Sequence, residues 1–447
     1  MSYDLVIIGA GPGGYVSAIR AGQSGLKTAL VEASGVGGMC LNWGCVPTKS
    51  LLESAKRFHM VKESAAFGVD GIEIDQLAFN WQTARKRSER IVKRLTKGIG
   101  YLLKKNGVEI VDGFATINNR NSVSVANRLL DTKHIIVATG SRPLALNLPV
   151  PEDLVTGIKE LLDMKTLPQQ PVVAGNGPHA IELAQFFSLV GKEVKLGVPD
   201  PVLAPRLDFR ISAHISKMFK KAKIEMFDLH EITGYEEGAL LVGDRRIPCD
   251  RIVNASEREA VVPQSGEPFT LDDGFIKVDE FLRTSIEGVY AVGDVNGRCN
   301  LAHTASAQGL HAVNVINGIQ QPFDFSVYPL NIYTYPEIAQ VGMTEEELKQ
   351  QDIPYKVNEF PLSANSKALI EGHIDGFIRM LSDKKYSEVL GVQIVADHAT
   401  DMIAEAALLM SMEGTTYDVA QTIHAHPTVS EIFMEAGFDA FEQPVHI

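Results

Sequence analysis

The sequence has 447 residues, a formal net charge of −13 at pH 7 and a hydrophobic content of 45%. A chain of this length is too long for one hydrophobic core and suggests roughly three domains of a large α/β protein. The acidic balance argues against nucleic acid or an anionic membrane surface as the main partner. No apolar run approaches the ~18 residues of a membrane-spanning helix, so we expect no membrane partner.

The first residues, MSYDLVIIGAG, lack the basic region and the long apolar stretch of a signal peptide. We therefore expect a cytoplasmic protein. In that reducing compartment, a pair of cysteines is usually catalytic, metal-binding or redox-sensing.

A glycine-rich turn follows the first predicted strand, residues 4–8. Gly9, Gly11 and Gly14 have the G-x-G-x-x-G spacing, and a helix is predicted directly after them. These glycines permit a tight turn, a close approach of the backbone to a pyrophosphate, and close packing of helix on strand. The next predicted strand ends in Glu32, whose carboxylate can hydrogen-bond ribose hydroxyls. The pattern predicts an N-terminal dinucleotide-binding domain.

The segment GGMCLNWGCVPTKSLL, residues 37–52, contains Cys40 and Cys45. Their spacing differs from C-x-x-C and no second pair lies nearby, so we predict no metal site. Residues five apart on a regular helix lie too far apart for a disulfide, so a bridge requires a distorted segment, which Gly44 makes easier. Pro47 favours a helix that starts at this point, and its N-terminus would favour a reactive Cys45 thiolate. The pattern favours a redox pair over two inert buried thiols.

Residues 76–106 are charged and periodic, and we predict them to form one long helix. A second glycine turn, with Gly175 and Gly177, lies in VVAGNGPHAIELAQFF, and another strand is predicted at 193–198. From about residue 326, strands alternate with helices, which predicts an α+β domain with an antiparallel sheet.

Several separated segments resemble the FAD-dependent pyridine nucleotide-disulfide oxidoreductases. GGMCLNWGCVPTKSLL resembles their redox-active segment, and HIIVATGSRP, GVYAVGDV and LAHTASAQG follow in the family's order. YTYPEIAQVGMTEEEL resembles the start of their dimerisation domain. The resemblance implies an α/β fold with two Rossmann-like domains, of FAD and NAD type, and a C-terminal α+β dimerisation domain. We expect the FAD-binding domain at 1–147 and 264–325, the NAD-type domain at 148–263, and the dimerisation domain at 326–447.

FAD is the cofactor that the resemblance implies. Cys40 would exchange with the substrate, and the Cys45 thiolate would lie against the flavin. Lys49, one helical turn beyond Cys45, matches the family's lysine near the flavin ring. The residues expected to contact FAD are Gly9, Gly11, Gly14, Glu32, Lys49, Thr139, Gly140, Asp294 and Ala302.

The segment IHAHPTVSE, residues 423–431, contains a candidate catalytic base. His426 precedes Pro427, which disfavours helical geometry, and Glu431 is placed to accept the other ring N–H and raise the basicity of the imidazole. An H-x-H pair can also bind a metal ion, but a dithiol substrate needs a base because the thiolate attacks a disulfide. The resemblance implies a homodimer in which His426 of one subunit serves Cys40 and Cys45 of the other. The form of this segment is similar to the branch of the family that oxidises dihydrolipoyl groups.

The NAD-type turn departs from the family at several positions. Gly175, Gly177 and Glu182 match the motif. Val198 stands where the family has the acid that binds the NAD ribose, and an apolar residue cannot accept hydrogen bonds from hydroxyls. Pro178 replaces the bulky residue that gates the nicotinamide pocket.

Further departures concern charge. Pro199 and Pro205 stand where an arginine pair would indicate NADP. In IVNASEREAVV, Ser256 and Glu257 stand at the family's Gly-Arg pair, and the acidic residues there would disfavour a cofactor pyrophosphate.

Three interpretations remain open. In the first, the protein oxidises dihydrolipoyl groups and passes electrons to NAD⁺ through altered contacts, with Asp200 in place of the missing acid. In the second, it does not use NAD(P), and a protein redox partner docks on the flavin instead. In the third, it is a flavin-bearing binding protein for lipoyl proteins; the presence of Cys40, Cys45, His426 and Glu431 argues against this one.

Overall fold

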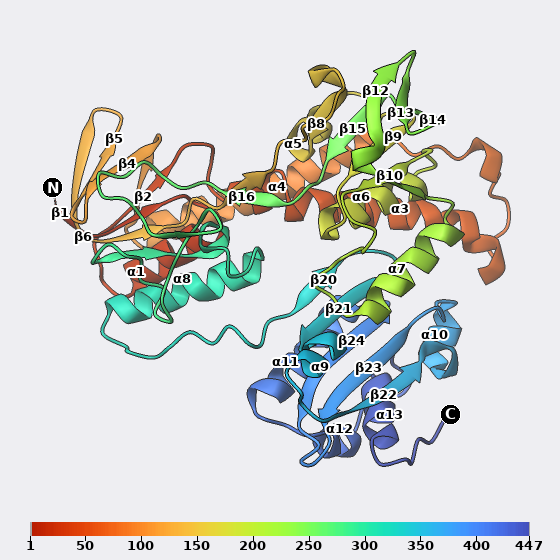
Figure 1. The fold of residues 1–447 in the computed structure, drawn as a ribbon. Helices are drawn as coiled ribbons and strands as arrows, with labels where there is room; N and C mark the ends of the chain where they lie inside the picture. The colour runs from red at the N-terminus through yellow and green to blue at the C-terminus, as the bar shows by residue number, and fades with distance from the viewer. Residues whose placement is uncertain (1, 447) are drawn as a thin grey trace.

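The computed structural model describes residues 2–446, which form three parts, each built on its own β-sheet (Figure 1). The first two sheets are built on parallel strands with helices beside them, and the third, C-terminal sheet is antiparallel. This arrangement confirms the predicted fold class of two Rossmann-like parts and a C-terminal α+β part.

The first sheet has seven strands, and its parallel part has the order β3-β2-β1-β6, with β19 beside β6. Ile8 at the end of β1 pairs with Val31 near the end of β2, so the glycine turn and Glu32 lie at the same edge of the sheet. Dinucleotides bind at this edge of doubly wound folds. Helices α1 and α8 pack together beside the sheet. The elements are β1 (Ser2–Ile8), α1 (Pro12–Gln23), β2 (Thr28–Glu32), β3 (Glu109–Asp112), β4 (Ala115–Asn119), β5 (Ser122–Val125), β6 (Arg128–Val137), β19 (Val289–Ala291) and α8 (Ala302–Ile316).

The second sheet has five parallel strands in the order β11-β10-β9-β15-β8. The second glycine turn joins β9 to α6, as predicted, and α7 follows β10. A small antiparallel sheet of β12, β13 and β14 extends from this part. The elements are β8 (Val155–Gly157), α5 (Ile158–Asp163), β9 (Pro171–Ala174), α6 (Pro178–Leu189), β10 (Lys195–Val198), α7 (Phe209–Lys221), β11 (Glu225–Asp228), β12 (Ile232–Glu236), β13 (Ala239–Val242), β14 (Arg245–Pro248) and β15 (Arg251–Asn254).

The third sheet has the order β20-β21-β24-β23-β22, and every pairing in it is antiparallel. Helix α11 packs on β21 and β24, and α13 packs on β22 and β23. The elements are β20 (Leu330–Ile332), β21 (Glu337–Gly342), α9 (Glu345–Gln350), β22 (Tyr355–Pro361), α10 (Ser366–Glu371), β23 (Phe377–Asp383), β24 (Val389–Ala396), α11 (Ala399–Ser411), α12 (Thr416–Gln421) and α13 (Glu431–Asp439).

The long predicted helix is shorter than expected. Helix α4 spans Trp81–Lys105, so the prediction of one helix over 76–106 was wrong for residues 76–80 and for Asn106, the C-cap. Asn80 ends the preceding loop, and its side chain accepts the backbone N–H of Thr83. This N-cap fixes the start of the helix.

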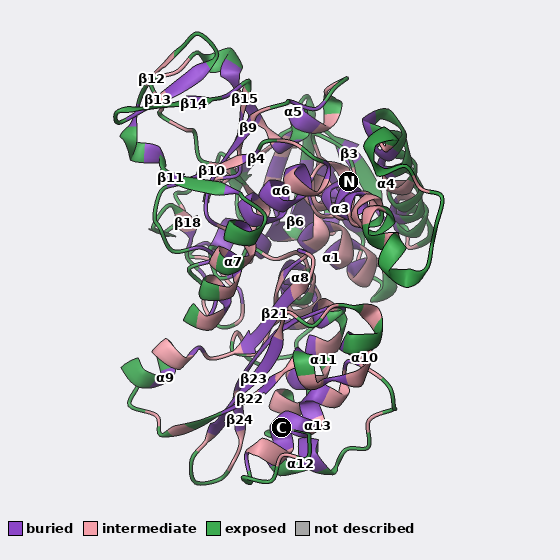
Figure 2. Cartoon of the chain, turned by 90° about the vertical axis from the view of Figure 1, so that its right-hand side faces the viewer, coloured by how far each residue is buried: buried purple, intermediate pink, exposed green. Residues whose placement is uncertain are grey.

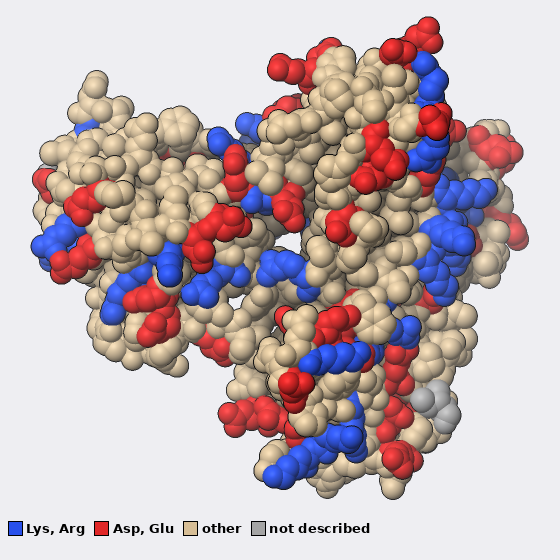
Figure 3. Space-filling model, in the orientation of Figure 1, with Lys and Arg blue, Asp and Glu red and all other residues tan. Residues whose placement is uncertain are grey.

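Buried residues concentrate in the sheet strands and in α6, whereas α4 exposes much of its length (Figure 2). Acidic and basic side chains are interspersed over the face drawn in Figure 3, which is hollowed between the part with α1 and α8 and the part with α5 to α7. Among residues 2–446, no helix combines the length and the apolar character that crossing a bilayer requires.

Candidate active site

A cavity of about 230 Å³ lies at the carboxyl ends of the strands of the first sheet. Cys40 and Cys45 line it together with seven of the residues predicted to contact FAD. The predicted residues in this lining are Gly9, Gly11, Glu32, Thr139, Gly140, Asp294 and Ala302.

The end of the cavity formed by the glycine turn fits the diphosphate and ribose of a dinucleotide. Gly9 has a φ of 99°, and a Cβ on Gly14 would lie 1.8 Å from the Gly9 carbonyl oxygen, so both positions require glycine. No atom lies within 4 Å of a Cβ placed on Gly11, which leaves the backbone open to a phosphate. Glu32 accepts the backbone N–H groups of Ala10 and Ser34, each at 2.6 Å, and keeps lone pairs for ribose hydroxyls.

An arginine that the sequence comparison missed also lines the cavity. Arg258 donates to the Ser141 carbonyl oxygen at 2.6 Å, and its Nε lies 3.9 Å from Asp294. Ser256 and Glu257, predicted to stand at the family's Gly-Arg pair, are not among the lining residues. An arginine therefore lies at the cavity directly after these two residues, although Arg258 itself was not among the predicted site residues.

The redox segment forms two helices with a break between the cysteines. Helix α2 (Gly38–Asn42) ends before Trp43, and α3 (Cys45–Glu63) begins at the second cysteine. A Cβ on Gly44 would come 3.0 Å from the Met39 carbonyl oxygen, so a larger residue would disturb the break. The expected distortion is confirmed, and Cys45 occupies the first position of a helix.

Trp43 and Met39 are two bulky residues of the redox segment. The Lys159 ammonium lies 5.0 Å from the centre of the Trp43 ring, and Trp43 lines the cavity. Met39 lines the cavity as well. Trp43 therefore joins the redox segment to α5 of the second part.

The two thiols form one coupled acid–base pair. A hydrogen bond from Cys40, against the effect of burial and with help from the Lys49 ammonium, lowers the pKa of Cys45 to about 7. The same hydrogen bond and burial raise the pKa of Cys40 far above its usual range. In the reduced pair, Cys45 is thus the thiolate and Cys40 keeps the proton.

Lys49 and Glu182 form an ion pair beside Cys45. The Lys49 ammonium lies 2.7 Å from Glu182 Oε2 and 4.7 Å from the centre of the Tyr333 ring. Burial disfavours the ammonium, but Glu182 more than offsets this, so the pKa of Lys49 is raised. Glu182 also accepts the Tyr333 N–H at 3.0 Å. Glu182, which was predicted for the NAD-type site, thus binds Lys49 and the backbone just after β20.

The titration of Cys45 provides a first prediction. In the reduced protein, the thiolate fraction should rise as the pH increases through about 7. Lys49→Met should move this transition upward by about one pH unit, because a cation that favours the thiolate is lost. The measurement is the ultraviolet absorbance of the thiolate against pH, with Cys45→Ser as the control that should lack the transition. An unchanged midpoint in Lys49→Met would contradict the assigned electrostatics.

His179 is a second residue of the cavity that the sequence did not single out. It follows Pro178 in the first turn of α6 and lines the cavity with Cys45 and Arg258. Burial, and to a lesser degree Lys49, lowers the pKa of His179 to about 4. At neutral pH this imidazole is uncharged.

The predicted histidine–glutamate pair lies on the third part. His426 Nδ1 is 2.9 Å from Glu431 Oε1, and Glu431 Oε2 accepts the Thr428 N–H at 2.9 Å. This confirms the predicted hydrogen bond, and Nε2 of His426 has no hydrogen-bond partner among the described residues, on a side chain that is 71% exposed. Neither residue lines the cavity of its own chain within residues 2–446.

The NAD-type turn keeps its backbone geometry. Gly175 has a φ of 141°, and Gly177 begins α6. Val198 is buried at the end of β10, and the Asp200 carboxylate, proposed above as a substitute acid, accepts the Val202 N–H at 2.8 Å. Asp200 is exposed and keeps its second oxygen free of hydrogen bonds within the described residues.

Two family models match the chain. Residues 3–309 match the model described as pyridine nucleotide-disulphide oxidoreductase. Residues 328–437 match the model for the dimerisation domain of the same family, which supports the predicted homodimer.

Curated relatives match over nearly the full chain. This chain is 37% identical to a dihydrolipoyl dehydrogenase of Thermus scotoductus, and the match covers 100% of this chain and 99% of the relative. It is 36% identical to the dihydrolipoyl dehydrogenase of Zymomonas mobilis, covering 99% of both. Among solved structures, LpdA from Mycobacterium tuberculosis has a TM-score of 0.88 at 21% identity and 98% and 99% coverage. The flavoprotein disulfide reductase RclA from Escherichia coli has a TM-score of 0.85 at 22% identity and 96% and 98% coverage.

Proposed function

Since this chain belongs to the pyridine nucleotide-disulphide oxidoreductase family, whose FAD-dependent chemistry its cavity fits, we propose that it oxidises dihydrolipoyl groups. The observation that carries this proposal is the coupled pair of Cys40 and Cys45 in the cavity, with Cys45 favoured as thiolate. The relatives named dihydrolipoyl dehydrogenase support the choice of substrate.

The dithiol half-reaction begins from the Cys40–Cys45 disulfide. Nε2 of the partner subunit's His426 takes the proton of one substrate thiol, and the resulting thiolate attacks Cys40 Sγ. The bond between the two cysteine sulfurs breaks, and its electron pair leaves on Cys45 as the thiolate. The second substrate thiol then attacks the substrate sulfur that is bonded to Cys40. The bond to Cys40 breaks, and Cys40 leaves as a thiol that carries the proton of the second substrate thiol. The substrate leaves as a disulfide, two electrons reside on the cysteine pair, and the protonation states match those of the reduced pair.

The residues around the cavity would hold FAD. Gly9, Gly11 and Glu32 would bind its diphosphate and ribose, and Asp294 would bind nearer the ring. When bound, FAD supplies a two-electron acceptor that reoxidises the cysteine pair and passes the electrons onward. Lys49 holds positive charge beside Cys45 and so stabilises its thiolate.

The onward acceptor has two candidates. NAD⁺ is the acceptor that the family implies, and the intact turn at Gly175 and Gly177 supports it. A different carrier, such as a protein redox partner, is favoured by the buried Val198 in the place of the ribose-binding acid. His179, at the start of α6, adds a polar group to the part of the cavity lining that comes from the NAD-type domain.

An anaerobic reduction experiment tests the proposal. The purified holoenzyme should contain FAD, and dihydrolipoamide should bleach the flavin absorbance rapidly. Cys45→Ser should retain FAD and resist this reduction, because it cannot form the disulfide. A wild-type protein that dihydrolipoamide does not reduce would refute the substrate assignment. Addition of NADH in a parallel sample decides between the two acceptors, since only an NAD-using enzyme is reduced rapidly by it.

A further inference from the structure

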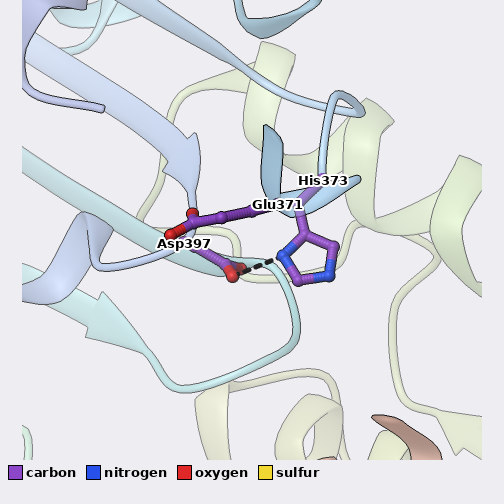
Figure 4. Close-up of side chains that lie close together, drawn as sticks. All are labelled: Glu371, His373 and Asp397. Atoms are coloured by element: carbon purple, nitrogen blue, oxygen red, sulfur yellow. Dashed lines mark hydrogen bonds and ion pairs between the residues drawn. The ribbon is translucent and has the colours of Figure 1, made fainter. Parts of the chain in front are cut away.

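Three potential metal ligands meet in the third part of the molecule, away from the cavity. Glu371 is the last residue of α10, His373 follows after one glycine, and Asp397 comes directly after β24. Gly372 has a φ of 78°, and this turn brings both of its neighbours toward Asp397. Figure 4 shows the His373 ring directed at Asp397 and the Glu371 carboxylate beside it. No metal-binding motif is visible in the sequence here, because the ligands come from two separate elements.

The spacing of the three ligand atoms suits one ion. One ligand atom from each residue lies within 4.8 Å of the others. Ligands held at about 2.1 Å from a common zinc ion lie within about 4.2 Å of one another. Side-chain movements of less than about 1 Å would therefore bring all three into the first coordination sphere.

Two carboxylate oxygens at this cluster have no hydrogen-bond partner among the described residues. They are Asp397 Oδ1 and Glu371 Oε2, and both atoms are buried. Asp397 as a whole is only 6% exposed. Its other oxygen lies 2.6 Å from His373 Nδ1, and the other oxygen of Glu371 lies 3.0 Å from the Lys367 ammonium. Buried carboxylate oxygens without partners are unfavourable, and a cation would satisfy both.

Tyr335 supports His373 from the opposite side of the ring. Its hydroxyl is hydrogen-bonded to His373 Nε2. Without a metal ion, Nδ1–H of His373 donates to Asp397 Oδ2. When an ion displaces this proton, Nε2–H can donate to the Tyr335 oxygen, and Nδ1 then presents its lone pair to the ion. Such an outer partner fixes the tautomer and orientation of metal-binding histidines.

Lys56 of α3 is the group that opposes a cation here. Its ammonium lies 3.7 Å from Asp397 Oδ2 and 4.5 Å from the centre of the Tyr335 ring. The same contacts would also suit an ion-pair network without metal, in which Lys56, Lys367 and a protonated His373 neutralise the carboxylates. Removal of Lys56 distinguishes the metal site from the ion-pair network. Without Lys56 a metal ion would bind more tightly, whereas an ion-pair network would be weakened.

We propose that Glu371, His373 and Asp397 form a binding site for a divalent transition-metal ion of the Zn²⁺ class. An imidazole with two carboxylates favours such ions over Mg²⁺ or Ca²⁺, which prefer oxygen ligands only. The ion would tie the turn after α10 to the end of β24. This site is independent of the proposed dithiol oxidation.

Equilibrium dialysis of the oxidised holoenzyme against Zn²⁺ tests the site. The oxidised form is used because free thiolates of Cys40 and Cys45 bind zinc themselves. Glu371→Gln, His373→Gln and Asp397→Asn should each weaken binding by at least about tenfold, and Lys56→Met should tighten it. His230→Gln is the matched control, because His230 is exposed and paired with Asp228 in the second part.

Circular dichroism and retained FAD show whether each variant folds, and Lys56→Met tests the site with all three ligands intact. One bound ion per chain, with the stated order of affinities, supports the site. The absence of saturable binding in both the wild type and Lys56→Met would overturn it. Binding that the three ligand substitutions leave unchanged would also overturn it.

Discussion

Replacing His426 with glutamine is expected to slow the reduction of the enzyme by dihydrolipoamide by about 10²–10⁴-fold, because a general base is lost. Glutamine keeps a similar size but cannot take a thiol proton. Glu431 holds Nδ1 of the imidazole at 2.9 Å, so Nε2 is the nitrogen left to act. The measurement is the rate of flavin bleaching after rapid mixing. His446→Gln is the matched control: this exposed histidine also pairs with a glutamate, Glu435, and its loss should leave the rate unchanged.

Mixed dimers test whether His426 acts across the subunit interface. A His426→Gln chain keeps its cysteines, and a Cys45→Ser chain keeps its histidine. The Cys45→Ser homodimer should be inactive and the His426→Gln homodimer strongly slowed, but the heterodimer has one complete site if the histidine serves the other subunit. It should therefore regain up to about half of the wild-type activity per dimer, since one of two sites is restored. No recovery in the heterodimer would show that His426 acts within its own chain, whereas a fully active His426→Gln homodimer would show that it has no catalytic role.

The local parts of the site were predictable from the sequence. Gly9, Gly11, Gly14 and Glu32 belong to one strand–helix–strand unit, so their spacing alone determines that they meet. The break before Cys45 was predictable for a different reason, because disulfide geometry is incompatible with a regular helix at that spacing. Neither prediction needed information about distant residues.

The Lys49–Glu182 pair was not predictable because it joins residues 133 positions apart in the chain. Glu182 was assigned to the NAD-type site from its place in a motif. One signal was present: Glu182 is the only acid in the otherwise uncharged segment PHAIELAQFFSL, and a carboxylate in a buried helix needs a cationic partner. The sequence indicates that a partner exists but not which one.

Arg258 was not predicted as a site residue because its place at the cavity depends on how two strands far apart in the sequence pair. It lies on β16 (Arg258–Ala260), which pairs with β7 (Ser141–Pro143). Side chains alternate between the faces of a strand, so a shift of one residue exchanges the two faces. Arg258 consequently lines the cavity, whereas Glu259 pairs with Arg142 at 2.6 Å on an exposed surface. The pairing of β16 with β7 decides which side chains face the cavity, and the sequence of neither strand alone predicts that pairing.

Arg379 is expected to be among the residues most important for stability. It is 4% exposed in its side chain and lies 3.0 Å from Asp208, which is fully buried at the start of α7. It also contacts Glu345 and Glu359, so it joins the second part of the molecule to the third. Removing one partner of a buried ion pair leaves uncompensated charge and typically costs 3–5 kcal/mol. Asp208 retains two backbone N–H donors, which favours the lower end of this range.

Arg379→Met should therefore lower the free energy of unfolding by about 3 kcal/mol in urea titrations at neutral pH. Arg246→Met is the matched control, because Arg246 is 47% exposed beside Glu236 and Glu237 and its removal should cost less than about 1 kcal/mol.

The same network sets the pKa of Glu345. Burial alone would raise this pKa, but hydrogen bonds from Lys349, Tyr355 and Arg379 lower it to about 2. The stabilisation from Glu345 is thus present above its unfolded pKa near 4.5 and is lost as the pH falls toward 2. Arg379→Met should flatten this acid dependence, and an unchanged profile with unchanged stability would show that the buried network contributes nothing.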